Sequence, residues 1–287
     1  MPNFKPQAGY IGYASVDGTI IRCNDFNINA SQEVEWYDHT IGLRDNIASN
    51  LFESKGDQGE NQLQKLIWRA GVKSYEGTIT YYLTKDKADP FFEYARTGDG
   101  FDMEFVYFCN IKRDFLTCKV NSWTISATAG DILTVTVNIW CLGVTEERTT
   151  DFKYTDVEKL LTWDTLLLDI EGIDDDEGLS TFDMTINNNL RTIYTAGINF
   201  AADLNPALQR VGMQEINGNF SLYGDATSLF VFLESEAGRT ISFTADSLSF
   251  VLNVLFHPSE RTGQVGIMTT VIKFDAVWDQ NAKGIDL

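Results

Sequence analysis

A short stretch that occurs twice decides the fold of this chain. Residues 77–82 read Gly-Thr-Ile-Thr-Tyr-Tyr, and residues 218–223 read Gly-Asn-Phe-Ser-Leu-Tyr. Arg-x-Gly precedes each copy, at residues 69–71 and 210–212, so the shared pattern is R-x-G-x5-G-x-[I/F]-[T/S]-x-Y. Its β-branched and aromatic residues are typical of a strand. The residues of this duplicated core motif are Arg69, Gly71, Gly77, Tyr82, Arg210, Gly212, Gly218 and Tyr223.

The sequence before the core motif is also repeated. Residues 25–29 resemble residues 183–187 at an offset of 158 (183 − 25), whereas the core motif repeats at an offset of 141 (210 − 69). The difference between the offsets places 17 extra residues in the first copy, between Tyr37 and Arg69. Repetition of several elements in one order indicates a duplicated unit. We therefore predict two tandem domains, residues 1–148 and 149–287.

Strand patterns dominate both copies. Apolar and polar residues alternate from Phe101 to Tyr107 and again from Leu133 to Ile139, which is the period of a strand. A last hairpin is predicted from Phe250 to Val277, with its turn through Gly263. Turn signals between the runs favour an antiparallel sandwich or barrel. The predicted fold class is all-β with short helices: two tandem β-sandwich or barrel domains, each with one flanking helix.

One helix is expected in each copy. In the first copy Asp89 can cap a helix, Pro90 suits its first position, and Gly98 can end it. An aromatic loop is the alternative for this segment. The repeat places the second helix at residues 228–233.

Composition excludes several classes of function. The chain has 287 residues, 44% of them apolar, and 41 acidic against 22 basic residues give a net charge of −19. This charge argues against nucleic-acid binding by phosphate neutralisation and against docking on an anionic membrane. No apolar run reaches the roughly 18 residues of a membrane helix, and residues 1–18 lack the apolar core of a secretion signal.

The sequence carries no pattern that indicates catalysis. The four cysteines form no C-x-x-C pair, and the two histidines, His39 and His257, have no zinc-ligand spacing. A nucleophile elbow, a Walker motif and a dinucleotide-binding motif are all absent from the sequence. We therefore expect no catalytic residue, no cofactor and no bound metal, and do not expect an enzyme.

A duplicated, acidic, β-rich pair of domains, one of which has a long loop, resembles bacteriophage tail tube proteins. The opening, residues 12–18 followed by residues 25–29, adds to the likeness. The resemblance implies that six such units close around a channel, so that chains with two units form trimeric, pseudo-sixfold rings. Stacked rings would make the tail tube that conducts DNA into the host cell.

The resemblance also implies partners and a location. The partners are copies of the chain itself, tape measure protein and DNA in the lumen, and a tail terminator and baseplate or tip proteins at the tube ends. The location is the virion, after assembly in the host cytoplasm. Neither sequence-specific nucleic-acid binding nor membrane insertion is expected.

The long polar stretch of residues 39–66 occurs in the first copy only. Loops of this length are usually functional or disordered, and long loops of tail tube proteins commonly bridge to the next ring. We therefore expect an inter-ring contact loop, with a solvated loop as the alternative. The candidate contact residues are Gly42, Asn46, Phe52, Asp57 and Gln62.

Two further interpretations concern charge. Three chains would carry a charge of −57 (3 × −19), and part of it could line the bore and repel DNA phosphates. The alternative is that the charge only keeps the surface soluble. The repeated Arg69 and Arg210 suggest a repeated ion pair or backbone contact, against two isolated surface arginines.

Two other functions remain open from the sequence. One is a tandem β-sandwich module that binds a ligand or carbohydrate. The other is a different ring protein of the tube family, such as a tail terminator, a baseplate hub or a secretion-system tube. Electron microscopy would distinguish long tubes from monomers and from single rings.

Overall fold

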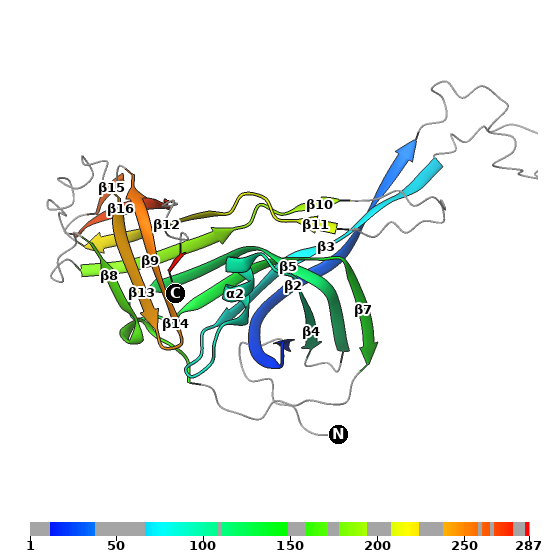
Figure 1. The fold of residues 1–287 in the computed structure, drawn as a ribbon, viewed down its shortest axis with the longest axis horizontal. Helices are drawn as coiled ribbons and strands as arrows, with labels where there is room; N and C mark the ends of the chain where they lie inside the picture. The colour runs from blue at the N-terminus through cyan, green and yellow to red at the C-terminus, as the bar shows by residue number, and fades with distance from the viewer. Residues whose placement is uncertain are drawn as a thin grey trace, which may run out of the picture.

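The computed structural model describes ten segments of the chain: residues 12–37, 67–107, 111–148, 159–171, 178–193, 208–223, 238–257, 260–264, 267–277 and 285–286. These segments are mostly β-strand and contain one α-helix, so the predicted all-β class is confirmed (Figure 1). No helix among them has the length and apolar character needed to cross a membrane.

The elements divide between two halves of the chain. The first half contains β1 (Gly12–Val16), β2 (Thr19–Tyr37), β3 (Ile67–Tyr82), α2 (Pro90–Thr97), β4 (Phe101–Tyr107), β5 (Ile111–Thr128), β6 (Thr134–Cys141) and β7 (Gly143–Arg148). The second half begins with a 3-10 turn, η1 (Trp163–Thr165), followed by β8 (Leu167–Ile170), β9 (Gly178–Asn187), β10 (Arg191–Ile193), β11 (Leu208–Arg210) and β12 (Glu215–Tyr223). It ends with β13 (Arg239–Ala245), β14 (Leu248–Phe256), β15 (Glu260–Gln264), β16 (Ile267–Ala276) and β17 (Ile285–Asp286).

Six antiparallel strands of the first half close into a barrel. The pairings run β1–β2–β3–β6–β5–β4 and return from β4 to β1. Inside, Phe26 of β2 stacks on Phe105 of β4 with ring centroids 3.6 Å apart. Closure gives each of these six strands a partner on both sides along at least part of its length.

The second half pairs its strands in the same order. Five of the six barrel pairings have a counterpart in the second half, namely β9–β12, β12–β16, β16–β14, β14–β13 and β13–β8. In this comparison β8 corresponds to β1, β9 to β2, β12 to β3, β13 to β4, β14 to β5 and β16 to β6. The buried aromatic residues of this half include Phe182, Phe220, Phe243 and Phe274, which pack against one another.

The pairing registers correct the sequence alignment of the first strands. Phe26 lies opposite Ile79 of β3, and Phe182 lies opposite Phe220 of β12, so β9 follows β2 by 156 positions (182 − 26) and not by 158. The core strands keep the predicted offset of 141 (220 − 79). The first copy therefore has 15 extra residues (156 − 141), not 17. The alignment followed Asp and Asn identities, whereas the register is determined by the side chains that face the core.

The bulges in the two hairpins agree with the corrected offset. The β2–β3 register shifts between Cys23 and Asp25, and the β12–β9 register shifts so that Ser180 is left out. Ser180 follows the bulged Asn24 by the same 156 positions (180 − 24).

The two halves share one sheet because β5 has two partners on the same edge. Its first part, from Ile111 to Cys118, pairs with β4, and its last part, from Ser122 to Thr128, pairs with β9. Helix α2 packs where β5 meets β9, and the buried Asn188 Nδ2 donates to Ala95 O and to Val120 O, both at 2.9 Å. The junction between the halves is therefore both paired and buried.

Helix α2 has the ends that the sequence predicts. Asp89 Oδ1 accepts a hydrogen bond from Phe91 N at 3.0 Å, and Pro90 is the first helical residue. Gly98 ends the helix in the left-handed region, with φ 72°, and its N–H donates to Tyr94 O. The predicted helix at residues 228–233 lies outside the described residues.

The last predicted hairpin is partly wrong. Residues 260–264, where the sequence predicts a turn through Gly263, form the strand β15, which pairs with β16 along its whole length. Its sequence, Glu-Arg-Thr-Gly-Gln, contains no apolar residue, so the alternation that marks a half-buried strand is missing.

Candidate functional site

One face of the shared sheet is polar across seven neighbouring strands. Residues that lie opposite each other in adjacent strands project from the same face. One row of such partners runs from β2 to β16 through Asp25, Thr80, Thr136, Thr124, Thr185, Asn217 and Asp275. The adjacent rows contain Thr78, Asn138, Ser122, Asn187 and Glu215, and Thr134, Ser126, Asp183, Asn219 and Lys273. We call these seventeen residues the polar face.

The opposite face of the same strands forms the core. Ile79, Val137, Ile125 and Met184 alternate with polar-face residues and are fully buried. An antiparallel sheet with one apolar and one polar side buries the first and leaves the second for water or for a partner. Most residues of the polar face are half-buried or exposed.

Neutral hydroxyl and amide groups dominate the polar face. Thr80 and Thr136 bring their Oγ1 atoms within 3.3 Å, and Thr124 and Thr185 bring theirs within 2.9 Å across the junction of the two halves. The charged members are the carboxylates Asp25, Asp183, Glu215 and Asp275 and one cation, Lys273. The face is thus hydrophilic, with an excess of negative charge.

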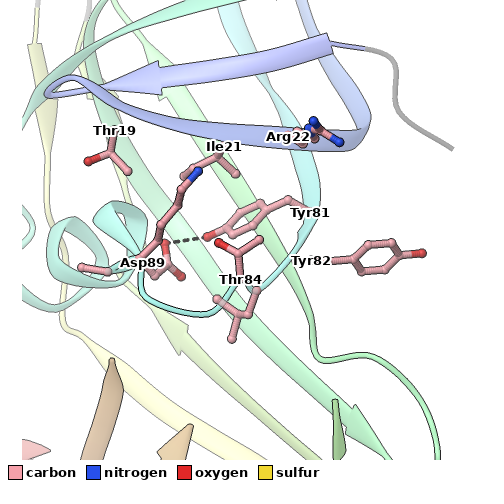
Figure 2. Close-up of a pocket in the computed structure, with 10 residues that line it drawn as sticks. Thr19, Ile21, Arg22, Tyr81, Tyr82, Thr84 and Asp89 are labelled. Carbon is pink, nitrogen blue, oxygen red and sulfur yellow. Dashed lines mark hydrogen bonds between the residues drawn. The ribbon is translucent and has the colours of Figure 1, made fainter. Parts of the chain in front are cut away.

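A hollow beside the start of α2 holds the enclosed carboxylate of Asp89 (Figure 2). Asp89 Oδ1 accepts from Tyr81 Oη at 2.7 Å and from Phe91 N at 3.0 Å, and Oδ2 accepts from Trp123 Nε1 at 2.9 Å. Desolvation raises the pKa of the Asp89 carboxyl, although these donors oppose the shift. Because both oxygens are engaged inside the fold, the carboxylate serves as a helix cap and a core anchor.

Asp89 is the one carboxylate among the described residues that line the hollow. This lining consists of Thr19, Ile21, Arg22, Tyr81, Tyr82, Leu83, Thr84, Lys87, Ala88 and Asp89. Across the described segments, no group of three or more His, Cys, Asp or Glu residues could hold a metal ion.

We expect Asp89→Ala to lower the free energy of unfolding by about 2–4 kcal/mol, since it removes a helix cap and leaves the donors of Tyr81 and Trp123 unsatisfied. Asp89→Asn keeps a side-chain oxygen for the cap and should cost about 1–2 kcal/mol. Urea unfolding followed by tryptophan fluorescence measures both variants. Equal stability of Asp89→Ala and the native chain would contradict the anchoring role.

The same residue predicts a pH dependence. An acid whose pKa is raised by folding contributes stability that is complete below its unfolded pKa, about 3.9, and is lost as the pH rises through its folded pKa. Asn does not titrate, so Asp89→Asn should gain stability relative to the native chain between pH 3.5 and pH 7. A constant difference in unfolding free energy over this range would contradict the raised pKa.

The duplicated glycines of the core motif occupy equivalent positions. Gly77 of β3 lies so close to β2 that a Cβ atom would come within 1.7 Å of Asn27 O. Gly218 of β12 has the same relation to β9, with Asp183 O at 2.2 Å. Both glycines therefore allow a close approach of two backbones that no larger residue permits.

The motif arginines have different cross-strand partners, whereas the motif tyrosines have the same type of partner. Arg69 lies opposite Glu35, whereas Arg210 lies opposite Arg191, so the two arginines have no common cross-strand partner. Tyr82 and Tyr223 lie opposite threonines, Thr134 and Thr269.

The motif glycines Gly71 and Gly212 mark the same irregular point of the long hairpin. The β2–β3 register shifts beside Gly71, and Gly212 lies between β11 and β12, where the strand is interrupted. The predicted contact loop, with Gly42, Asn46, Phe52, Asp57 and Gln62, lies outside the described residues.

Sequence reasoning missed the polar face. Its signal was present as Thr, Ser, Asn and Asp at every second position of residues 122–126, 134–138 and 181–187. Only the apolar residues of each alternating run were used to predict strands, because these residues indicate which face of the strand is buried. The face could not be assembled without the strand order.

Comparison with known proteins identifies a family. A family model described as phage tail tube protein matches residues 68–275, which include both copies of the core strand and most of the chain. No match was found among curated proteins.

Proposed function

This chain belongs to the phage tail tube protein family, and from that premise we propose that it closes into rings that stack and conduct DNA through their bore. Family membership makes it a structural subunit of the tail, a virion component that assembles with other tail proteins. We further propose a non-enzymatic role, assembly in the host cytoplasm, and contacts with a tape measure protein, a tail terminator and baseplate proteins.

We propose that the chain is one duplicated unit, with domains at residues 1–148 and 149–287, and that three chains form a pseudo-sixfold ring. The observation that supports this most is the agreement of pairing order, register and bulge between the halves. The β5–β9 pairing also supplies a pattern for joining one unit to the next through a shared sheet. Repeating such a side-by-side contact by rotation closes a ring.

The polar face is the proposed wall of the bore. Four carboxylates against one lysine would repel phosphates, and neutral hydroxyl groups neutralise no phosphate, so they release none of the counterions that drive DNA binding. DNA would therefore slide past this wall and not bind to it. The opposite, apolar face cannot take this place because it forms the core of both halves.

We further propose that residues 39–66 bridge to the adjacent ring. In Figure 1, β2 and β3 extend beyond the barrel as a two-stranded arm, and their last pair is Tyr37 with Ile67. Tyr37 and Ile67, which flank this segment, therefore lie at the end of the arm that is farther from the barrel, and we propose that the neighbouring ring lies on that side.

Negative-stain electron microscopy of the purified chain tests these proposals. We expect hollow tubes from the native chain and rings without long tubes from a variant that lacks Gly42 to Gln62. A variant with this segment replaced by Gly-Ser residues of equal length controls for spacing. Monomers alone from the native chain would favour a binding module, single rings would favour a terminator or hub, and normal tubes from the deletion variant would contradict the bridging role.

A further inference from the structure

The part of β5 that pairs with β9 and joins the two halves has an equivalent strand in the second half, β15. Thr124 of β5 lies opposite Thr136 of β6, and Glu260 of β15 lies opposite Val271 of β16. Ile79 of β3 lies opposite Val137 of β6, and its equivalent Phe220 of β12 lies opposite Ile272 of β16, so β16 follows β6 by 135 positions (272 − 137). Val271 is therefore the equivalent of Thr136, and β15 follows the end of β5 by 136 positions (260 − 124). β15 is therefore the second-half equivalent of the part of β5 that binds β9.

One edge of β15 is unpaired within the described segments. It pairs with β16 on one side, and within the described segments no other strand pairs with it. The other side is the equivalent of the edge through which β5 binds β9. The equivalent of β9 is β2, and among the residues that the structure describes its corresponding edge is covered by β1 only from Thr19 to Cys23.

We propose that β15 of one chain pairs in antiparallel fashion with β2 of the next chain, in the register of β5 and β9. This inference rests on the proposed ring and identifies its contact between chains. The offsets place Glu260 opposite Asn29, Arg261 opposite Ile28, and Gln264 opposite Asp25 of the next chain, as Thr124, Ile125 and Thr128 lie opposite Thr185, Met184 and Thr181 within the chain.

The residue sizes fit this register. Within the chain, the small Ala127 lies opposite Phe182, and both are buried. In the proposed contact Gly263 takes the place of Ala127 and Phe26 that of Phe182. A small residue beside a large aromatic one is thus kept at both junctions.

The two edges also suit a head-to-tail contact. β15 and β2 lie on opposite sides of the molecule in Figure 1, so a chain cannot satisfy one with the other. A contact between different surfaces of identical chains is heterologous, and it closes into a ring when the rotation per chain fits. The partner is therefore a second copy of this chain.

The hydrogen-bonding groups of the edge can be assigned by the same equivalence. Ala129 N donates to Ser180 O, and Asn188 N donates to Asn121 O, so odd-numbered residues of this part of β5 point their backbone groups toward β9. Their equivalents in β15 are Arg261 and Gly263. The even-numbered Glu260 then belongs to a pair without direct backbone bonds, in which side chains are closest.

Disulfide trapping tests the register. Glu260→Cys combined with Asn29→Cys, in assembled protein under mild oxidation, should give covalent multimers on a non-reducing gel, and a mixture of the two single variants should give dimers only. The matched control is Glu260→Cys with Asp25→Cys, because Asp25 lies about 13 Å further along the strand. Rings that cross-link no better in the test variant than in the control would overturn the proposed register.

A proline variant tests the edge by a second route. Arg261→Pro removes a backbone donor that faces the next chain and leaves the β15–β16 bonds, so we expect a folded monomer that forms no rings. Arg261→Gln should assemble normally, which separates the backbone from the charge. Rings from Arg261→Pro would overturn the pairing, whereas absence of rings from the native chain would overturn the proposed function itself.

Discussion

Gly77→Ala is expected to prevent the first half of the chain from closing its barrel. The new Cβ atom would lie 1.7 Å from Asn27 O and 2.6 Å from the Asn27 carbonyl carbon, and both are backbone atoms of the adjacent strand. A flexible side chain could move away, but the β2 backbone is held by its pairing with β3 both before and after Asn27. We expect a loss of more than about 3 kcal/mol in unfolding free energy, measured by urea unfolding of the soluble fraction.

The same substitution elsewhere provides the control. Gly143→Ala in β7 would meet only Leu116 Cδ1 at 3.9 Å, an ordinary contact, so its stability should stay within about 0.5–1 kcal/mol of the native chain. Gly218→Ala should resemble Gly77→Ala, because Asp183 O lies at 2.2 Å and the Phe274 ring at 2.5 Å. Similar stability of Gly77→Ala and Gly143→Ala would contradict the close approach of the strands.

The sequence predicted those elements whose signals are local. Alternation located β4 and β6, and the Asp89, Pro90 and Gly98 positions defined both ends of α2. These signals work because burial on one face and helix capping both depend on neighbours within a few residues. The duplicated glycines were also found from the sequence, since the close contact of two backbones admits no other residue.

The sequence could not predict features that depend on strand order. The sharing of β5 between β4 and β9, the continuity of the polar face, and the correct offset of β9 all follow from pairings between distant segments. β15 was missed for a related reason, because a polar edge strand lacks the alternating apolar residues from which strands are predicted. Polar residues on alternate positions became informative only when seven strands placed them side by side.

The second large effect is expected from cations on the polar face. Thr78→Lys combined with Thr185→Lys adds two positive charges per chain on β3 and β9, two strands whose side chains do not meet. If this face lines the bore, assembled tubes should retain short duplex DNA at about 50 mM salt and release it near 500 mM, because each neutralised phosphate steepens the salt dependence. Co-sedimentation of labelled DNA with tubes measures the retention, and native tubes should retain none.

The location of the charge, and not the charge alone, must produce this result. Ser15→Lys combined with Ser249→Lys adds the same charge on β1 and β14, outside the polar face, and should leave DNA unbound inside the tube. A confined channel places every phosphate near the wall, so charges there act together, whereas cations on an outer surface act singly and are screened within about 8–10 Å. Equal retention by the two double variants would contradict the assignment of the polar face to the bore. Retention by the first variant alone would support a neutral-to-acidic wall as the reason that DNA can move through it.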